Sequence, residues 1–337
     1  MMTDNHTIII AEIGVNHEGS LDLACRMIRE AAAAGCDYAK FQTFKSENLV
    51  CRTAERAGYQ KRNCGGDETQ LDMLRRYELS AGDFAFLQQE CSRNGIGFLS
   101  SAFDPESISL LESIPMDYWK IPSGEITNLP YLRRIARPGR KIILSTGMSD
   151  LDEVKAAVSV FEAGGVSRGD IVLLHCNTQY PTPMCDVNLR AMDTLATLGC
   201  GMVGYSDHTP GITVPVAAVA RGARMLEKHF TIDKTLPGPD HRASLEPSEM
   251  RAMVSAVRDV EMALGSAEKR VTESERANAG VARKSIVAAR RIVKGAIITE
   301  CDIAAKRPGT GLSPMMWDSV TGSVAVRDFE PDEQIEI

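Results

Sequence analysis

Eight short apolar runs, rich in β-branched and aliphatic residues, follow one another along the first part of this 337-residue chain. The stretches between them carry helical patterns. One of them, LDLACRMIREAAAAG, places Leu21, Leu23, Met27 and Ile28 on one helix face and stops at Gly35. Strict alternation of strand and helix predicts a parallel α/β sheet, and eight of each close most simply as a (β/α)8 TIM barrel. The runs are TIIIAEIG, YAKFQTF, GFLSSAF, YWKIPSG, KIILSTG, IVLLHCN, MVGYSDH and MLEKHF.

Each run also ends in a polar or ionisable residue, which ordinary buried strands have no reason to do so consistently. The C-terminal ends of barrel strands converge on one face, where catalytic residues are gathered. Residues two apart share a face, and inward polar residues are costly unless they meet a partner or a ligand. An internal hydrogen bond explains any single pair equally well, but the set predicts an active site. The pairs are Lys40 with Gln42, His175 with Asn177, Ser206 with His208, and Glu227 with His229.

Three segments are predicted along the chain. Residues 1–267 form the barrel domain, whose longest interruption, SENLVCRTAERAGYQKRNCGGDETQ, lies where barrels carry functional loops or lids. Residues 268–283 lose the apolar rhythm and are predicted to be a linker. Residues 284–337 combine short strand patterns with turns at KGA, PGTG and PDE, which indicates a small β-rich domain. Such a domain is marginally stable alone and is expected to pack on a barrel.

Charge and cysteine usage narrow the class of protein. The formal net charge is −7, and the one short basic cluster, LRRIARPGRK, is typical of a solvated helix end, so nucleic-acid binding is not expected. The nine cysteines form no C-x-x-C pair, which argues against a zinc knuckle or a disulfide scaffold and favours the reducing cytoplasm. No apolar stretch approaches the ~20 residues of a membrane span, so no membrane association is expected.

Two histidines stand at matching positions, His208 after the seventh run and His229 at the end of the eighth. Neighbouring strands lie ~4.8 Å apart, so the two imidazoles can chelate one divalent ion and leave coordination sites for water and a substrate oxygen. Two structural histidines are the alternative. With so few protein ligands, Mn²⁺ or Mg²⁺ is favoured over a closed structural Zn²⁺ site.

Lys40 and Lys120 end the second and fourth runs, where a lysine serves either as a Schiff-base nucleophile or as an anchor for phosphate and carboxylate groups. Nearby hydroxyl groups favour the anion site, and no phosphate-binding loop of the nucleotide type is present. Three carboxylates are best placed for proton transfer or sugar binding, although each could instead be a salt-bridge partner. The hydroxyls are those of Ser123, Ser145 and Ser206, with backbone N–H groups near Gly124 and Gly147, and the carboxylates are Glu12, Glu125 and Asp240.

The ordered motifs AEIGVNHEGS, KFQTF, YWKIPSGE, ILSTGM, LHCNTQYPTP, GYSDHT, EKHF and GPDHRAS closely resemble those of the bacterial sialic acid synthases. The tail VARKSIVAARRIVKGAIITECDIAAKRPGTGLSP is similar to the antifreeze-like (SAF) domain that follows their barrel. The resemblance covers essentially the whole chain. It implies a transferase that condenses phosphoenolpyruvate with an N-acetylated mannosamine-type sugar to give a nine-carbon nonulosonic acid.

The resemblance also implies roles for individual residues. It makes His208 and His229 the ligands of a divalent metal, usually Mn²⁺, with Mg²⁺ or Co²⁺ as other candidates. Glu125 is expected near the reacting carbons, and Arg307 of the K-R-P-G motif is expected to enter the partner subunit's barrel in a domain-swapped homodimer. Phosphoenolpyruvate is assigned to Lys40, Lys120, Ser123, Ser145, Ser206 and either Asn177 or Thr178, and the acceptor sugar to Glu12, Gln42, Tyr180 and Asp240.

Within this family the expected acceptor is N-acetylmannosamine, giving N-acetylneuraminate and phosphate with addition of water and cleavage of a C–O bond. The alternative is an N,N′-diacetyllegionaminate synthase, which takes 2,4-diacetamido-2,4,6-trideoxymannose. A Schiff-base aldolase built on Lys40 or Lys120 is a rival among barrel enzymes, and the paired histidines count against it. A non-enzymatic ice-binding role is suggested only by the antifreeze-like tail.

Overall fold

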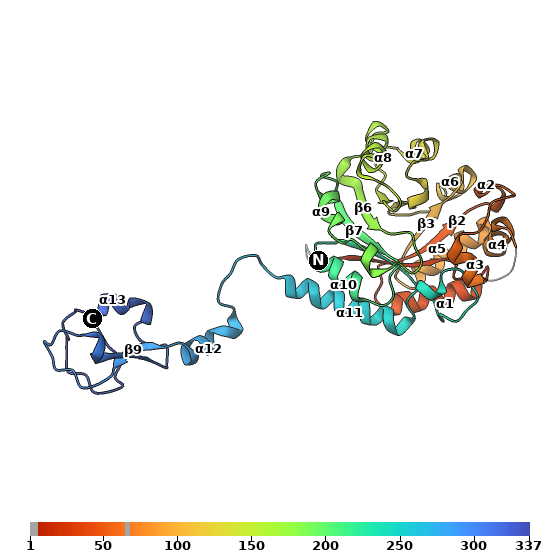
Figure 1. Ribbon diagram of the computed structural model, residues 1–337. Helices are drawn as coiled ribbons and strands as arrows, with labels where there is room; N and C mark the ends of the chain where they lie inside the picture. The colour runs from red at the N-terminus through yellow and green to blue at the C-terminus, as the bar shows by residue number, and fades with distance from the viewer. Residues whose placement is uncertain (1–5, 65–67) are drawn as a thin grey trace. The chain divides into compact units, whose positions relative to one another are not determined.

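The structure is a computed structural model that describes residues 6–64 and 68–337. The chain divides into two compact units, Met1–Gly265 and Ser266–Ile337 (Figure 1). Among the described residues, no helix is both long and apolar enough to cross a membrane.

The first unit is a nearly closed barrel of eight parallel strands in the order β3-β2-β1-β8-β7-β6-β5-β4, which confirms the predicted fold class (Figure 1). The ends of this order, β3 and β4, lie next to each other. The strands are β1 Ile8–Gly14, β2 Tyr38–Thr43, β3 Gly97–Ala102, β4 Trp119–Ile121, β5 Ile142–Ser145, β6 Ile171–Cys176, β7 Met202–Asp207 and β8 Met225–His229.

Helices follow the strands and cover the outside of the barrel. In α1, Ser20 caps the N-terminus by accepting a bond from the Leu23 amide, and Met27 and Ile28 are fully buried against the sheet, as their spacing predicts. The α-helices of this unit are α1 Leu21–Ala33, α2 Ser46–Leu49, α3 Gly58–Cys64, α4 Gln70–Tyr77, α5 Ala81–Arg93, α6 Pro105–Leu111, α7 Leu129–Ile135, α8 Leu151–Ala163, α9 Ala191–Ala196, α10 Thr213–Ala220 and α11 Pro247–Leu264. Short 3-10 helices are η1 Ser123–Glu125, η2 Arg168–Asp170, η3 Met184–Asp186 and η4 His241–Ala243.

The two faces of the strands have separate tasks. On β1, Ile9, Ala11 and Ile13 belong to the large core shared with the helices, whereas Ile10 belongs to a second cluster. Side chains alternate along a strand, so residues two positions beyond this second cluster share its inward face. The cluster therefore closes the barrel below its C-terminal mouth; its buried members are Ile10, Leu99, Tyr118, Ile143, Val172, Leu174 and Met225.

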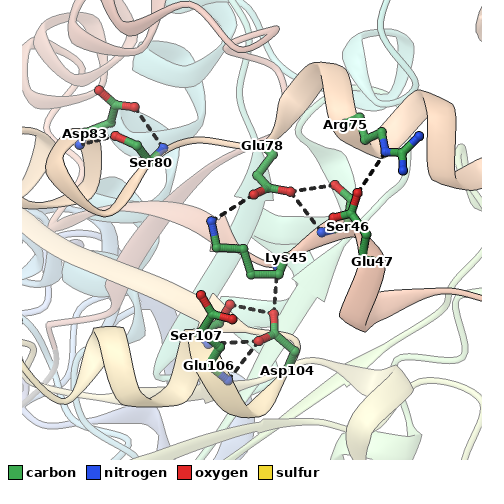
Figure 2. A network of polar contacts seen from close by, with 10 residues as sticks. All are labelled: Lys45, Ser46, Glu47, Arg75, Glu78, Ser80, Asp83, Asp104, Glu106 and Ser107. Atoms are coloured by element: carbon green, nitrogen blue, oxygen red, sulfur yellow. Dashed lines mark hydrogen bonds and ion pairs between the residues drawn. The ribbon is translucent and has the colours of Figure 1, made fainter.

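The long interruption after β2 contains α2, α3 and α4, and a polar network fixes its base (Figure 2). The Glu78 carboxylate accepts bonds from the Lys45 ammonium (2.9 Å), the Ser46 amide (2.9 Å) and the Ser46 hydroxyl (2.8 Å). Asp104 accepts from the Lys45 amide at 2.8 Å and caps the N-terminus of α6. The end of α4 is thereby tied to the segments that follow β2 and β3.

The second unit contains a two-stranded antiparallel sheet, β9 Ser285–Ala288 and β10 Ile303–Lys306, around a small core that includes Ile298 and Phe329. The predicted linker is not wholly irregular, because it includes the exposed helix α12 Glu273–Ala282. A capping box between Thr272 and Glu275 begins this helix, and the lack of an apolar stripe concealed it in the sequence. The remaining elements are η5 Glu300–Asp302, η6 Pro314–Met316 and α13 Trp317–Val320.

Candidate active site

A cavity of about 230 Å³ opens at the C-terminal mouth of the barrel. Most of the residues selected from the sequence line it, because each lies at or just after the end of a strand. Glu125, Asn177 and Arg307 do not line it. The selected residues on its wall are Glu12, Lys40, Gln42, Lys120, Ser123, Ser145, Thr178, Tyr180, Ser206, His208, His229 and Asp240.

The floor of the cavity is a cluster of buried charges centred on Glu227, a residue that the sequence placed on the inward face without assigning it a role. Its Oε1 lies 3.3 Å from Lys120 Nζ and accepts a bond of 2.9 Å from the Ser206 hydroxyl. Its Oε2 lies 3.6 Å from Lys40 Nζ. Glu227 therefore joins strands β2, β4 and β7 at one point.

The two lysines differ in their electrostatic surroundings. Burial lowers the pKa of Lys40, but the facing carboxylates of Glu12, 2.7 Å away, and Glu227 outweigh burial and raise it. Burial also lowers the pKa of Lys120, and there the attraction of Glu227 only partly compensates. Lys120 donates a 2.8 Å bond to the Ser145 hydroxyl. Of the two lysines, Lys120 therefore loses its proton more readily.

A second wall is built by the turns after β4, β5 and β6. The Ser123 hydroxyl accepts a 3.0 Å bond from the Gly147 amide, so this N–H is already used within the protein. A Cβ at Gly147 would lie 2.7 Å from the Thr178 methyl group and 2.9 Å from Ser123 Oγ, so the turn has room only for glycine. Thr178 faces the cavity, whereas the Asn177 carboxamide accepts from the Gln179 amide at 2.8 Å.

The prediction that His175 and Asn177 share the inward face of the sixth strand is wrong. The inward set on β6 comprises Val172 and Leu174, with Cys176 on the cavity wall. The His175 ring lies on the other face, where its Nε2 is 2.8 Å from the Val187 carbonyl oxygen. The polar residues that end this run correctly marked the C-terminal mouth of the barrel. They did not show which residues of the strand point inward.

His208 and His229 come together above the floor, with ring centroids 5.2 Å apart and the Tyr180 ring packed against both. The Nδ1 atom of His208 is bonded to the Asn177 carbonyl oxygen, which orients the ring. Burial lowers the pKa of His208 to about 4, and burial together with His208 holds the pKa of His229 well below its usual value. Both imidazoles are therefore neutral at pH 7, the form that binds metal.

The donor set fits an open metal site. No group of three or more His, Cys, Asp or Glu side chains suited to a metal occurs among the described residues, which argues against a closed structural zinc site. His229 Nδ1 is buried and has no hydrogen-bond partner within residues 6–64 and 68–337, and it lies 3.9 Å from an Asp240 oxygen. Two neutral imidazoles, one with an unpartnered nitrogen, suit a divalent ion whose other ligands are water and substrate.

Glu12, Gln42 and Asp240 occupy the side of the cavity near β1 and β2. Gln42 Nε2 donates a 2.9 Å bond to Glu12 Oε1. Gly14, at φ 54°, leaves space for this pair, since a Cβ there would lie 2.9 Å from Glu12 Oε1. Burial, with a contribution from Glu12, raises the pKa of Asp240 to about 7. These polar groups could hold the hydroxyl groups of a sugar.

Two residues lie apart from this set. Glu125 ends the 3-10 helix η1, and its half-buried carboxylate accepts a 2.6 Å bond from Asn128, the N-cap of α7. Its neighbour Gly124 lines the cavity, and the position of Glu125 near the reacting carbons stays a prediction. Arg307 belongs to the second unit, where its Nε donates to the Ala282 carbonyl oxygen at 3.0 Å.

The chain matches the NeuB family over residues 27–269 and the SAF domain over residues 283–336. It is 46% identical over 329 residues to the N,N'-diacetyllegionaminic acid synthase of Campylobacter jejuni, covering 98% of both chains. It is 48% identical over 317 residues to the Legionella pneumophila protein of the same name, covering 94% of this chain and 89% of that one. The crystal structure of a Leptospira borgpetersenii N-acetylneuraminic acid (sialic acid) synthetase with citrate is similar at a TM-score of 0.71 and 34% identity, covering 81% of this chain and 90% of that one.

The fold and the cavity define a barrel enzyme with a charged mouth, followed by a small antiparallel β domain. The chain belongs to the NeuB family and carries a SAF domain, as its motifs predict. It is a nonulosonic acid synthase, a transferase-type enzyme that condenses phosphoenolpyruvate with an acetamido sugar. Enzymes of this family generally use a divalent metal.

Proposed function

We propose that this enzyme condenses phosphoenolpyruvate with 2,4-diacetamido-2,4,6-trideoxymannose and water to give N,N′-diacetyllegionaminate and phosphate. The sequence motifs alone favoured N-acetylmannosamine as the acceptor. The higher identity to two N,N'-diacetyllegionaminic acid synthases than to an N-acetylneuraminic acid synthetase supports the diacetamido sugar instead.

The observation that carries the proposal is the pair of buried lysines on the floor of the cavity. Lys40 and Lys120, with the hydroxyls of Ser145 and Ser206, form a positively charged cradle that suits the phosphate and carboxylate groups of phosphoenolpyruvate. Both ammonium groups already have carboxylate partners, so the anion would enter a preorganised network. For Lys40, whose pKa these carboxylates raise, the arrangement favours an anion site over an imine, because a Schiff-base lysine must give up its proton.

The residues above the cradle would direct the chemistry. Glu12 and Gln42 orient the open-chain sugar so that C3 of phosphoenolpyruvate forms a bond to its aldehyde carbon, whose oxygen gains a proton. Water then adds at C2, and one of its protons passes through Glu12 to the former aldehyde oxygen. The C–O bond to phosphate breaks as the new C2 hydroxyl becomes a carbonyl, and the hydroxyl proton leaves with the phosphate. Lys40 and Lys120 hold the departing phosphate. Glu12 is given the role of base here because it lines the cavity beside Gln42.

The metal proposed at His208 and His229 is Mn²⁺, which when bound would polarise the aldehyde oxygen. Titration of the protein with Mn²⁺, followed by electron paramagnetic resonance, tests the assignment without requiring turnover. His208→Ala should weaken Mn²⁺ binding by at least about a hundredfold, since losing even an outer partner of a ligand costs 10–100-fold. His175→Ala is the matched control, because that ring faces away from the site, and its affinity should stay unchanged. Unaltered Mn²⁺ binding in His208→Ala would overturn the metal assignment.

Two measurements test the reaction. Comparison of kcat/KM for the two sugars should favour the diacetamido acceptor, and a preference for N-acetylmannosamine would refute the proposal. Turnover in ¹⁸O-labelled water should place the label in the nonulosonic acid. Label in the released phosphate would rule out C–O cleavage.

We also propose that Arg307 completes the cavity of a second copy in a domain-swapped homodimer. Its side chain is exposed, and among the described residues it bonds only to the Ala282 carbonyl oxygen. The second unit also exposes neighbouring apolar side chains, Ile297 (65%) and Val324 (56%), which pair across an antiparallel bridge. Such exposure supports association with another surface.

A further inference from the structure

One wall of the cavity is apolar, in contrast to its charged floor. Five residues form this wall, which we call the α4 wall: Val15, Met73, Leu74, Tyr77 and Phe103. Three of them come from α4, and the other two follow strands β1 and β3. With Phe44, they pack into a small hydrophobic cluster that is separate from the main core. No member of the wall was among the candidate site residues chosen from the sequence.

The α4 wall has a fixed position over the part of the cavity assigned to the sugar. Val15 is three residues beyond Glu12, and Glu12 is bonded to Gln42 on the adjacent strand. The Glu78 network anchors the C-terminal end of α4 (Figure 2). A capping box between Thr69 and Asp72 begins the helix.

The same excursion is also anchored to the loop after β8, the strand on the other side of β1. Asn63 of α3 donates a 2.6 Å bond to the Pro239 carbonyl oxygen, next to Asp240. The helices α3 and α4 therefore lie along the side of the mouth that is formed by β1, β2 and the loop after β8. A wall held at both sides can discriminate between ligands, because it cannot move away from a group that fits poorly.

The two acceptor sugars differ in the chemistry that such a wall would meet. N-acetylmannosamine carries hydroxyl groups at C4 and C6, whereas the trideoxy sugar carries an acetamido group at C4 and a methyl group at C6. Both distinguishing groups of the trideoxy sugar thus end in a methyl. A hydroxyl buried against apolar side chains loses water without gaining a partner, whereas a methyl gains from the same burial.

We propose that the α4 wall determines acceptor specificity by accepting the methyl-terminated groups of the trideoxy sugar and disfavouring the hydroxyls of N-acetylmannosamine. This inference rests on the proposed function, and it adds the residues that read the acceptor. Leu74 and Val15 are the most direct points of test, because each lines the cavity and has a near-isosteric polar replacement.

The test is kcat/KM for three acceptors: the diacetamido sugar, N-acetylmannosamine, and 2-acetamido-2,6-dideoxymannose, which separates the C6 methyl from the C4 group. Leu74→Asn should lower the preference for the diacetamido sugar over N-acetylmannosamine by about tenfold or more, the scale of discrimination by one apolar pocket. KM for phosphoenolpyruvate should stay unchanged, because Lys40 and Lys120 are held by Glu12, Glu227 and Ser145, none of which belongs to the wall. Leu71→Asn is the matched control; it makes the same change on the same helix, but Leu71 does not line this cavity, and its preference ratio should equal that of the wild type.

The outcomes separate the two proposals. A wild-type enzyme that prefers N-acetylmannosamine overturns the proposed function together with this inference. A wild-type preference for the diacetamido sugar that Leu74→Asn leaves intact overturns the role of the wall alone. An equal fall of the ratio in Leu71→Asn also overturns it, since the effect would then be general to the helix. If Leu74→Asn does not fold, Val15→Thr makes a smaller polar change on the same wall, and an unchanged ratio there refutes the inference.

Discussion

Glu227 is the residue through which the two lysines and a hydroxyl of the cavity floor are held together. Glu227→Gln keeps the shape of the side chain and removes its charge. The pKa of Lys120, already lowered by burial, should then fall further, because the attraction of Glu227 is lost. A charged Lys120 is needed to bind the anion, so the alkaline limb of kcat/KM for phosphoenolpyruvate should move to lower pH, with a fall of at least about tenfold near pH 8.

Ser206→Ala is the control for this prediction, since it removes an uncharged partner of Glu227 and keeps the carboxylate. Its alkaline limb should stay at the wild-type position. If both variants lose activity equally at every pH, Glu227 has only a packing role.

At the level of residues, the alternation of side chains along a strand correctly predicted most of the residues that face the cavity. It did not predict the directions of Glu125 and His175. Lys40, Lys120 and Ser206 lie on the inward face because strand parity places them there. Glu125 follows a strand equally closely, but the 3-10 turn aims it at Asn128. His175 was misplaced because a polar run end does not reveal which of its last two residues points inward. The direction of the His175 ring depends on its bond to Val187, which lies twelve residues further along the chain and outside the strand pattern.

At the level of elements, the barrel strands were predictable because each is a run of β-formers bounded by turn residues. The excursion after β2 was recognised as a long functional loop, but its helices were not. Two of them, α2 Ser46–Leu49 and α3 Gly58–Cys64, are too short to show helical periodicity. The placement of α2 depends on the tertiary contacts of Glu78 (Figure 2), and that of α3 on the bond from Asn63 to the Pro239 carbonyl oxygen.

Glu78→Gln should therefore destabilise the excursion in a pH-dependent way. Although burial opposes it, bonds from Ser46 and Lys45 hold the pKa of Glu78 below its usual value of 4.5. A lowered folded-state pKa stabilises the protein above pH 4.5, and this contribution disappears as pH falls through the folded-state value. Thermal denaturation should show the variant less stable by about 1.5–3 kcal/mol at pH 7, the range for hydrogen bonds to a charged group, and the difference should be smaller at a pH well below 4.5.

Glu47→Gln is the comparison for Glu78, because it removes the exposed ion pair with Arg75 at the edge of the same network (Figure 2). Exposed pairs contribute about 0–1 kcal/mol, so this variant should remain close to the wild type at both pH values. An equal loss in the two variants would show that Glu78 is no more than a surface partner. A raised KM for the sugar in Glu78→Gln alone would connect the network to the α4 wall.

At the level of the whole molecule, the antiparallel second unit was expected from its turn motifs, but its helix α12 was not. A partner subunit cannot be deduced from strand and helix patterns, because these patterns report only contacts within one chain. The proposed dimer rests instead on the family resemblance and on the exposed Arg307 and Ile297. The proposal predicts that two inactive variants can restore activity in a mixed dimer, which would not occur if each site were built from one chain.

Co-expression of Arg307→Ala with His208→Ala, each carrying a different tag, allows the mixed dimer to be isolated. In a swapped dimer the intact arginine of one chain serves the intact barrel of the other, so one of the two sites is complete. The mixed dimer should then show about half of the wild-type activity per dimer at low sugar concentration, although each parent dimer is strongly impaired. If Arg307 served its own barrel, both sites of the mixed dimer would be defective, and its activity would not exceed the mean of the parents.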